Sequence, residues 1–263
     1  MPAVIRWLRQ AAFWCGYTLA RRASDTDVRT LIQRLRPRQT GVPLIRLGGK
    51  GDGGYLIPDD LAGIEYCFSP GVNYTADFEN ALADRQIRSF LADYSVEQPP
   101  LLRPEFVFDR KFIGARDDQV YMTFGRWKDK YLPDYAGELL LQMDVEGSEY
   151  EVVLNTPSEL LAMCRIIVVE LHALERMFDG FAYRIIKACV DKLLHDFYVV
   201  HAHPNNCSGM TRWNGIEIPH VMELTLYNRR RAAPGDYCRE FPHPLDADNC
   251  RDRPSITLPR NWR

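Results

Sequence analysis

The sequence predicts an α/β fold in which helices cover both faces of a mostly parallel central sheet. Short apolar runs of strand length alternate with segments whose apolar residues recur at helical spacing. The run 139–143 is broken only by Gln142, as expected of a strand that is buried on both faces. Several runs end in charged residues, and ligands of such sheets bind beyond those strand ends.

Residues 1–40 are expected to form a helical extension that precedes the sheet. Within it, segment 3–17 combines arginines with Trp7, Trp14 and Tyr17, a composition that suits a helix lying in a membrane interface. The same pattern also suits a helix that packs on the domain or a partly disordered extension. No stretch is long and apolar enough to span a bilayer. Arginines interrupt any signal-peptide core, so a peripheral contact is the membrane alternative.

A helix is predicted over 25–36 and ends at Pro37. The glycine-rich stretch 46–54 follows. Glycines let its backbone approach a ligand closely, and the stretch also suits the turn of a two-stranded hairpin. No lysine followed by serine or threonine completes a phosphate-binding loop, so that function is excluded.

A strand over 65–68 leads through Gly71 into a helix over 75–85 and a second strand over 87–91. Asp93 follows 22 residues after Gly71, close to the spacing at which a carboxylate meets a ribose hydroxyl. The full G-x-G-x-x-G fingerprint is absent. The unit therefore favours a nucleoside-type ligand over a pyrophosphate.

Further strands are predicted over 106–115 and 119–124. Three more are predicted over 165–172, 197–203 and 221–226, and an amphipathic helix precedes the strand 197–203.

Composition excludes some classes of function and partner. The net charge of −2 provides no basic field for nucleic acid. Seven scattered cysteines without a C-x-x-C pair argue against a zinc ribbon or a disulfide framework. Free thiols, including Cys238 and Cys250, are favoured over a bridge between these two. This usage indicates a reducing compartment, hence a cytoplasmic protein.

The centre of the predicted site follows the strand 139–143. Asp144 and Glu146 stand where that strand emerges from the sheet, and Gly147 permits a sharp turn. Ser148 and Glu151 have the spacing of a capping box, which predicts the start of a helix.

Three predicted strands end in a polar pair whose members are two residues apart. Side chains at this spacing project to the same side of a strand, so the pairs would share one crevice if the strands were neighbours. Carboxylates and imidazoles suit Mg²⁺, Mn²⁺, iron or Zn²⁺. The same cluster without metal would supply a histidine general base. The pairs are Asp144 and Glu146, Glu170 and His172, and His201 and His203.

The motif D-V-E-G-S-E at 144–149, the strand I-I-V-V-E-L-H and the unit from Gly71 to Asp93 resemble the FkbM-type family of S-adenosylmethionine-dependent methyltransferases. The similarity runs from about residue 46 to about residue 228. It implies a Rossmann-like class I methyltransferase fold over 41–228, with 229–263 as a C-terminal tail. It also implies methylation of a hydroxyl on a saccharide, glycolipid or related natural product. The cofactor-binding residues that it implies are Ser69, Gly71, Asn73, Asp93, Asp144 and Glu146.

An analogy with metal-dependent catechol-type methyltransferases extends this set. It makes Asp144, Glu170 and His203 candidate ligands of a divalent metal. The candidate catalytic residues are Asp144, His172 and His203, with either histidine as the base in a metal-free reaction. Two other classes compete with this hypothesis: a non-catalytic glycan- or protein-binding module of the same fold, and a metal-dependent hydrolase. The unit from Gly71 to Asp93 argues against a hydrolase, which needs no ribose-binding carboxylate.

Overall fold

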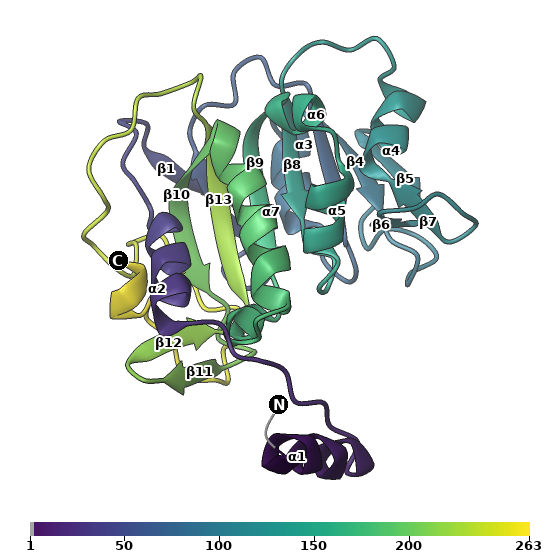
Figure 1. Cartoon of the computed structure of the whole chain (residues 1–263). Coiled ribbons are helices and arrows are strands. Elements are labelled where there is room, and N and C mark those ends of the chain that lie inside the picture. Colours follow the sequence, from purple (N-terminus) through teal and green to yellow (C-terminus); the bar gives the residue numbers. More distant parts are fainter. Residues whose placement is uncertain (1–2) are drawn as a thin grey trace.

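A computed structural model describes residues 3–263 and has a seven-stranded central sheet (Figure 1). The strands are β3 (Tyr66–Pro70), β4 (Arg88–Ala92), β5 (Phe106–Asp109), β8 (Leu139–Met143), β9 (Cys164–Leu171), β10 (Phe197–Pro204) and β13 (Met222–Asn228). Their order is β10-β13-β9-β8-β3-β4-β5. Neighbours from β9 to β5 are parallel, whereas β13 is antiparallel to both β9 and β10. The predicted α/β class and mostly parallel sheet are confirmed.

Both faces of the sheet are covered. Apolar side chains of the main helical layer and of one face of the sheet form a single core. On the other face, one helix and the hairpin β1–β2 form a second core. The main layer comprises α2 (Asp25–Arg34), α4 (Phe124–Tyr131), α5 (Glu149–Asn155), α6 (Ser158–Ala162) and α7 (Ala182–Asp196); the second has α3 (Asp77–Ala83), β1 (Leu44–Leu47) and β2 (Tyr55–Pro58). The glycine-rich stretch is thus the turn of this hairpin.

Short elements complete the chain, and α1 stands apart from the domain (Figure 1). They are α1 (Ala3–Trp14), β6 (Phe112–Gly114), β7 (Tyr121–Thr123), η1 (Leu174–Phe178), β11 (Met210–Trp213), β12 (Ile216–Pro219) and η2 (Arg260–Trp262).

Both ends of the chain contribute to the main core. Helix α2 has Ser24 as its N-cap, whose hydroxyl accepts a hydrogen bond from the Asp27 N–H, and the helix buries Ile32 completely. From the C-terminal tail, Leu258 and Trp262 pack into the same cluster. Helix α2 and the C-terminal tail therefore share one core with the sheet.

The segment 106–124 differs from the two strands predicted there. The first strand stops at Asp109, whose carbonyl accepts from the Lys111 N–H in a tight turn. After it, β6 and β7 pair in parallel as a separate two-stranded sheet. Helix α4 begins at Phe124, with Thr123 as its N-cap. Local turn chemistry overrides the apolar alternation here.

The prediction of unpaired cysteines is wrong for two residues. Cys207 and Cys250 form a disulfide between positions 43 residues apart in the sequence. The other cysteines are free. Sequence spacing carried no sign of this pair, because the tail returns to the loop after β10 only in the folded chain. This disulfide removes the basis for expecting a reducing compartment, because that expectation depended on unpaired cysteines.

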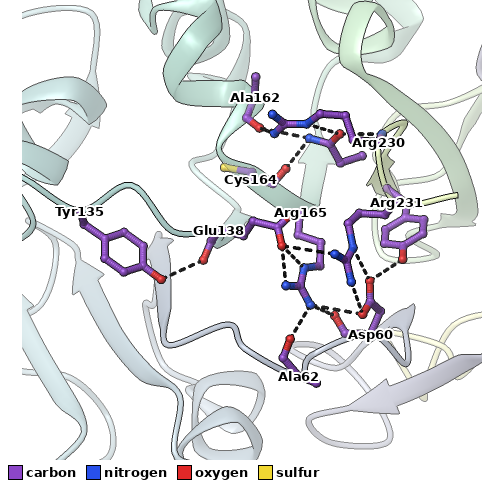
Figure 2. Close-up of polar contacts among 11 residues, drawn as sticks. Asp60, Ala62, Tyr135, Glu138, Ala162, Cys164, Arg165, Arg230 and Arg231 are labelled. Atoms are coloured by element: carbon purple, nitrogen blue, oxygen red, sulfur yellow. Dashed lines mark hydrogen bonds and ion pairs between the residues drawn. The ribbon is translucent and has the colours of Figure 1, made fainter.

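A buried arginine ties the amino end of β9 to two other segments (Figure 2). The Arg165 side chain is only 5% exposed. It donates to the carbonyls of Asp60 and Ala62 at 2.9 and 2.8 Å and to the Glu138 carboxylate at 2.9 Å. Arg231 donates to both Asp60 oxygens at 2.9 and 3.0 Å. The paired charges satisfy one another, so losing one partner leaves buried groups without compensation.

We expect Arg165→Met to lower the free energy of unfolding by roughly 3 kcal/mol, because two backbone carbonyls and the half-buried Glu138 carboxylate lose a charged donor. Denaturant unfolding followed by circular dichroism measures the change. Arg116→Met is the matched control, since its ion pair with Asp118 lies on the surface and should matter little. Equal stability of the two variants would contradict a structural role for the Arg165 cluster.

Candidate active site

The loop after β3 lies directly against the loop after β8. Gly71 has a φ of +89°, and a Cβ at this position would stand 1.4 Å from the Asp144 carbonyl oxygen. The Asp144 N–H donates to the Pro70 carbonyl at 3.3 Å, and the Gly71 N–H donates to that of Ala92 at 2.9 Å. Only glycine fits this crossing, for reasons of both space and backbone conformation.

Asp93 stands at the end of β4 and is only 4% exposed. One carboxylate oxygen accepts from the Asn73 N–H at 2.9 Å. The other accepts from the backbone and hydroxyl of Ser95 at 2.8 and 2.6 Å. Asp93 therefore holds the turn that contains Asn73, whose φ is +38°. Oδ1 thus uses both of its lone pairs on Ser95, whereas Oδ2 keeps one acceptor site for a ligand.

Two adjoining cavities open at this crossing. The larger has a volume of about 440 Å³, and its walls include Asp93, Phe112 and Tyr121. The smaller has a volume of about 110 Å³, and its walls include Asp52 and Glu79. The residues that line both cavities are Gly71, Asn73, Tyr74, Asp144 and Glu146.

Ser69 lies beneath these two cavities and lines neither of them. It is fully buried, and its hydroxyl is bonded to Glu79 and to Gln142, the latter at 2.6 Å. One hydroxyl hydrogen cannot serve both acceptors. Burial raises the pKa of Glu79, so a protonated Glu79 that donates to Ser69 satisfies the network. Gln142 in turn donates to the Tyr55 hydroxyl at 3.3 Å. Ser69 thus supports two side chains of the smaller cavity.

Carboxylates surround His172 at the edge of the cleft. Its Nδ1 lies 3.0 Å from Glu149 Oε1, and its Nε2 lies 3.4 Å from Glu146 and 3.8 Å from Asp144. Within the part of the chain that the structure describes, Asp144, Glu149 and His172 are the group of three whose ligand-type atoms lie within 4.8 Å of one another. Its geometry would allow a metal ion.

Glu149 replaces the predicted capping box. Ser148 makes no side-chain capping bond at the start of α5, so the predicted role of Ser148 with Glu151 is wrong. The fully buried Glu149 carboxylate accepts from the N–H groups of Val145 and Gly147 at 3.1 Å each. The buried Glu149 carboxylate therefore fixes the turn through two backbone donors and His172.

The pKa values of Asp144 and His172 depend on each other. Burial raises the pKa of Asp144 to about 7, against the lowering effect of His172; Glu146 and Glu149 add to the rise. Burial alone would lower the pKa of His172. The hydrogen bond that its Nδ1–H donates to Glu149 and the charges of the surrounding carboxylates instead raise the pKa to about 9. At neutral pH the imidazolium therefore stabilises an Asp144 carboxylate that is close to its titration point.

Glu170, His201 and His203 form a second group. Strand β13 completes this group because it lies between β9 and β10. Our assumption that these strand ends are neighbours is wrong for β10. Glu223 of β13 lies opposite Glu170 on one side and His203 on the other. Asn205 donates to Glu170 at 2.6 Å, and Asn249 donates to Glu223 at 2.6 Å. Burial raises the pKa of both glutamates.

Asp246 of the tail contacts both histidines of β10. Its carboxylate oxygens lie 2.8 Å from His201 Nε2 and 3.7 Å from His203 Nδ1. Burial lowers the pKa of His201. It would also lower that of His203, but Asp246 and Glu223 raise it instead. Glu223 and Asp246 were missed from the sequence. The acid inside the apolar run M-E-L-T-L was a readable signal, whereas nothing in the tail distinguished Asp246.

The structure thus divides the predicted site. Around the cavities it brings together Gly71, Asn73, Asp93, Asp144 and Glu146, with His172 beside them. The proposed metal set of Asp144, Glu170 and His203 is not gathered within 4.8 Å among the described residues. Glu170 and His203 belong to the row that β13 completes.

Comparisons with known proteins give little support to any family. No family model matches the chain, and no curated protein matches it. Among solved structures, the fibrillarin/Nop5p complex includes a chain that is 14% identical, with a TM-score of 0.38; the match covers 64% of this chain and 74% of that one. Similarity this low carries no argument about function. The resemblance to the FkbM-type family stays a prediction.

His172 should make stability pH-dependent. Its folded pKa of about 9 lies above the unfolded value of 6.5. The stabilisation that protonated His172 gives to the folded state is therefore complete below pH 6.5 and is lost as the pH rises through about 9. We expect the free energy of unfolding to fall by roughly 3 kcal/mol across this range. With a pKa of about 7, Asp144 is largely ionised above about pH 8, so denaturant unfolding between pH 8 and 9 follows mainly His172.

His172→Gln should flatten this part of the profile. His195→Gln is the control, because the His195 side chain is 80% exposed and lies on α7 away from the cavities. A profile that keeps its full slope in His172→Gln would show that another group carries the pH dependence.

Proposed function

We propose that this chain is an S-adenosylmethionine-dependent methyltransferase that acts on a hydroxyl of a saccharide, glycolipid or related natural product. One observation carries the proposal: Gly71 and Asp144, pressed together at the crossing, form a wall common to two cavities, and Asp93 lines the larger. Such a bipartite cleft beyond the strand ends suits a ligand made of a nucleoside and an amino acid.

The larger cavity suits the nucleoside. Its volume lies within the roughly 300–1,000 Å³ of typical small-molecule sites. Asp93 Oδ2 has spare acceptor capacity for a ribose hydroxyl. Phe112 and Tyr121, with ring centroids 5.7 Å apart, offer apolar surface on which an adenine can stack.

The smaller cavity suits the ammonium group of the amino acid portion. Asp52, Glu79 and Asp144 surround it, and the Asp144 and Glu146 carboxylates attract an ammonium group. With the two portions so placed, the sulfur atom that joins them would lie beside Asp144. When bound there, the cofactor supplies an electrophilic methyl group on a positively charged sulfur.

Asp144 is the proposed base. Its pKa of about 7 makes it a carboxylate that can take the proton of an acceptor hydroxyl near neutral pH. His172 acts as a positioning residue, because a pKa of about 9 keeps it protonated and its charge holds Asp144 in place. His203 lines neither cavity, so it leaves the proposed set of bases. Exposed Glu146 and Tyr74 at the opening provide hydrogen-bonding and stacking groups for a sugar.

A metal-assisted version of the reaction needs a different ligand set from the predicted one. Asp144 would hold a divalent ion with Glu149 and His172, the compact group in the described part of the chain. The ion would lower the pKa of the acceptor hydroxyl. Activity that survives exhaustive chelation would leave Asp144 as a base without metal.

Asp93→Ala should weaken binding of S-adenosylmethionine about tenfold or more, since ribose hydroxyls lose a charged acceptor. Isothermal titration measures the affinity, and thermal unfolding checks that the Asn73 turn is intact. Asp109→Ala is the matched control, because Asp109 ends the adjacent strand β5 but lines neither cavity. Undiminished affinity in a folded Asp93→Ala protein would refute the ribose assignment. A non-catalytic binding module need not bind the cofactor at all.

At saturating cofactor, Asp144→Asn should reduce kcat at least about 10²-fold. It should also weaken cofactor binding, because the same carboxylate attracts the positively charged ligand. In the wild type, kcat should rise with pH through about 7, as Asp144 loses its proton, and then level off. Mass spectrometry of glycan mixtures incubated with isotope-labelled cofactor detects the transferred methyl group. Full activity of Asp144→Asn would exclude this residue as the base.

A further inference from the structure

Helix α1 exposes an apolar stripe that the domain leaves uncovered. Val4, Trp7, Leu8 and Ala11 follow the i, i+3, i+4, i+7 spacing of one helix face. Trp7 is 68% exposed, and Trp14 near the helix end is 82% exposed. In α2, by contrast, residues at this spacing are buried in the core. An amphipathic helix with its apolar face in water indicates a surface that binds something else.

Charge identifies the occupant. Residues 1–24 contain Arg6, Arg9, Arg21 and Arg22 but no aspartate or glutamate, although the whole chain has a net charge of −2. Two copies of such a segment would repel each other. An anionic surface would attract it, at a gain of about fivefold in affinity for each arginine that reaches the surface.

Length and aromatic content favour a bilayer surface over a spanning segment. None of the described helices is long and apolar enough to cross a membrane. The twelve residues of α1 extend only about 18 Å, against a hydrocarbon core of about 30 Å. Tryptophan and tyrosine prefer the boundary between lipid and water, and Trp7, Trp14 and Tyr17 are all exposed.

The segment after α1 is fixed to one end of the domain. The Arg22 guanidinium lies 5.0 Å from the ring centroid of Trp213 at the β11–β12 turn, and Arg29 of α2 donates to the Asn214 carbonyl at 2.6 Å. Figure 1 shows α1 at the same end of the molecule as β11 and β12. Trp213 is itself 53% exposed, and Arg212 beside it is largely exposed. Arg212 is paired with Glu217 at 2.8 Å, so the hairpin adds the exposed aromatic ring of Trp213 on the side from which α1 emerges.

We propose that α1, the arginines that follow it and the β11–β12 turn bind the surface of a bilayer that contains anionic lipids. The apolar stripe enters the interface while the arginines contact the headgroups. This inference is independent of the proposed methyl transfer.

Vesicle sedimentation of the full chain tests the proposal. The protein should sediment with vesicles of phosphatidylcholine mixed with phosphatidylglycerol, much less with phosphatidylcholine alone, and less again as salt screens the arginines. Trp7→Ser/Trp14→Ser should abolish sedimentation, and Arg6→Gln/Arg9→Gln should weaken it about 25-fold. Leu102→Ser is the control, because this 72%-exposed residue lies outside α1 and should leave binding unchanged.

Tryptophan fluorescence provides a second measurement. Trp127 and Trp262 are fully buried, so a blue shift on adding anionic vesicles must come from exposed tryptophans. Trp7→Phe/Trp14→Phe should keep sedimentation but lose most of the shift. The proposal is overturned if the wild type does not sediment with anionic vesicles. It is also overturned if the helix variants abolish concentration-dependent self-association instead, which would make a second copy the occupant.

Discussion

The contact between Gly71 and the Asp144 carbonyl is the constraint on which the cleft depends. A side chain at Gly71 would stand 1.4 Å from that oxygen, so the two loops can meet only through a glycine. Their meeting places Asp93, bonded to the Asn73 N–H, on one wall and Asp144 on the wall that both cavities share. The geometry of the cleft follows from the absence of one methyl group at one strand end.

Buried acids then determine the chemistry of this edge of the sheet. Glu149 is enclosed completely, yet two backbone N–H groups and His172 accommodate its Oε1 atom. Because His172 is held by Glu149, its charge is available to Asp144. One buried carboxylate thus determines both the turn after β8 and the protonation of the residue that faces both cavities.

Local patterns in the sequence predicted the features that lie within one stretch of chain. The buried strand 139–143, the turn at Gly71 and Asp93 after β4 each depend on neighbours in sequence. The row across β9, β13 and β10 could not be predicted in the same way. A spacing of two residues shows that side chains share a face of one strand, but it does not show which strand lies alongside.

The same reason explains the missed residues. Glu223 acquires its role because β13 inserts between two strands that precede it in the chain. Asp246 and Cys250 acquire theirs because the tail returns to the end of β10. Such pairings connect segments far apart in sequence, and the free energy that selects them comes from the packed whole.

The acids of the cleft would distinguish the proposed cofactor from its product. Asp52, Asp144 and Glu146 line the smaller cavity, and each additional negative charge there raises the cost of ionising Asp144. A positively charged ligand relieves this repulsion, whereas a neutral one does not. In the proposed reaction the ligand would lose its positive charge while Asp144 would gain the proton of the acceptor hydroxyl. Both changes would weaken the attraction between cleft and ligand, so the electrostatics that favour binding before the reaction would favour release after it.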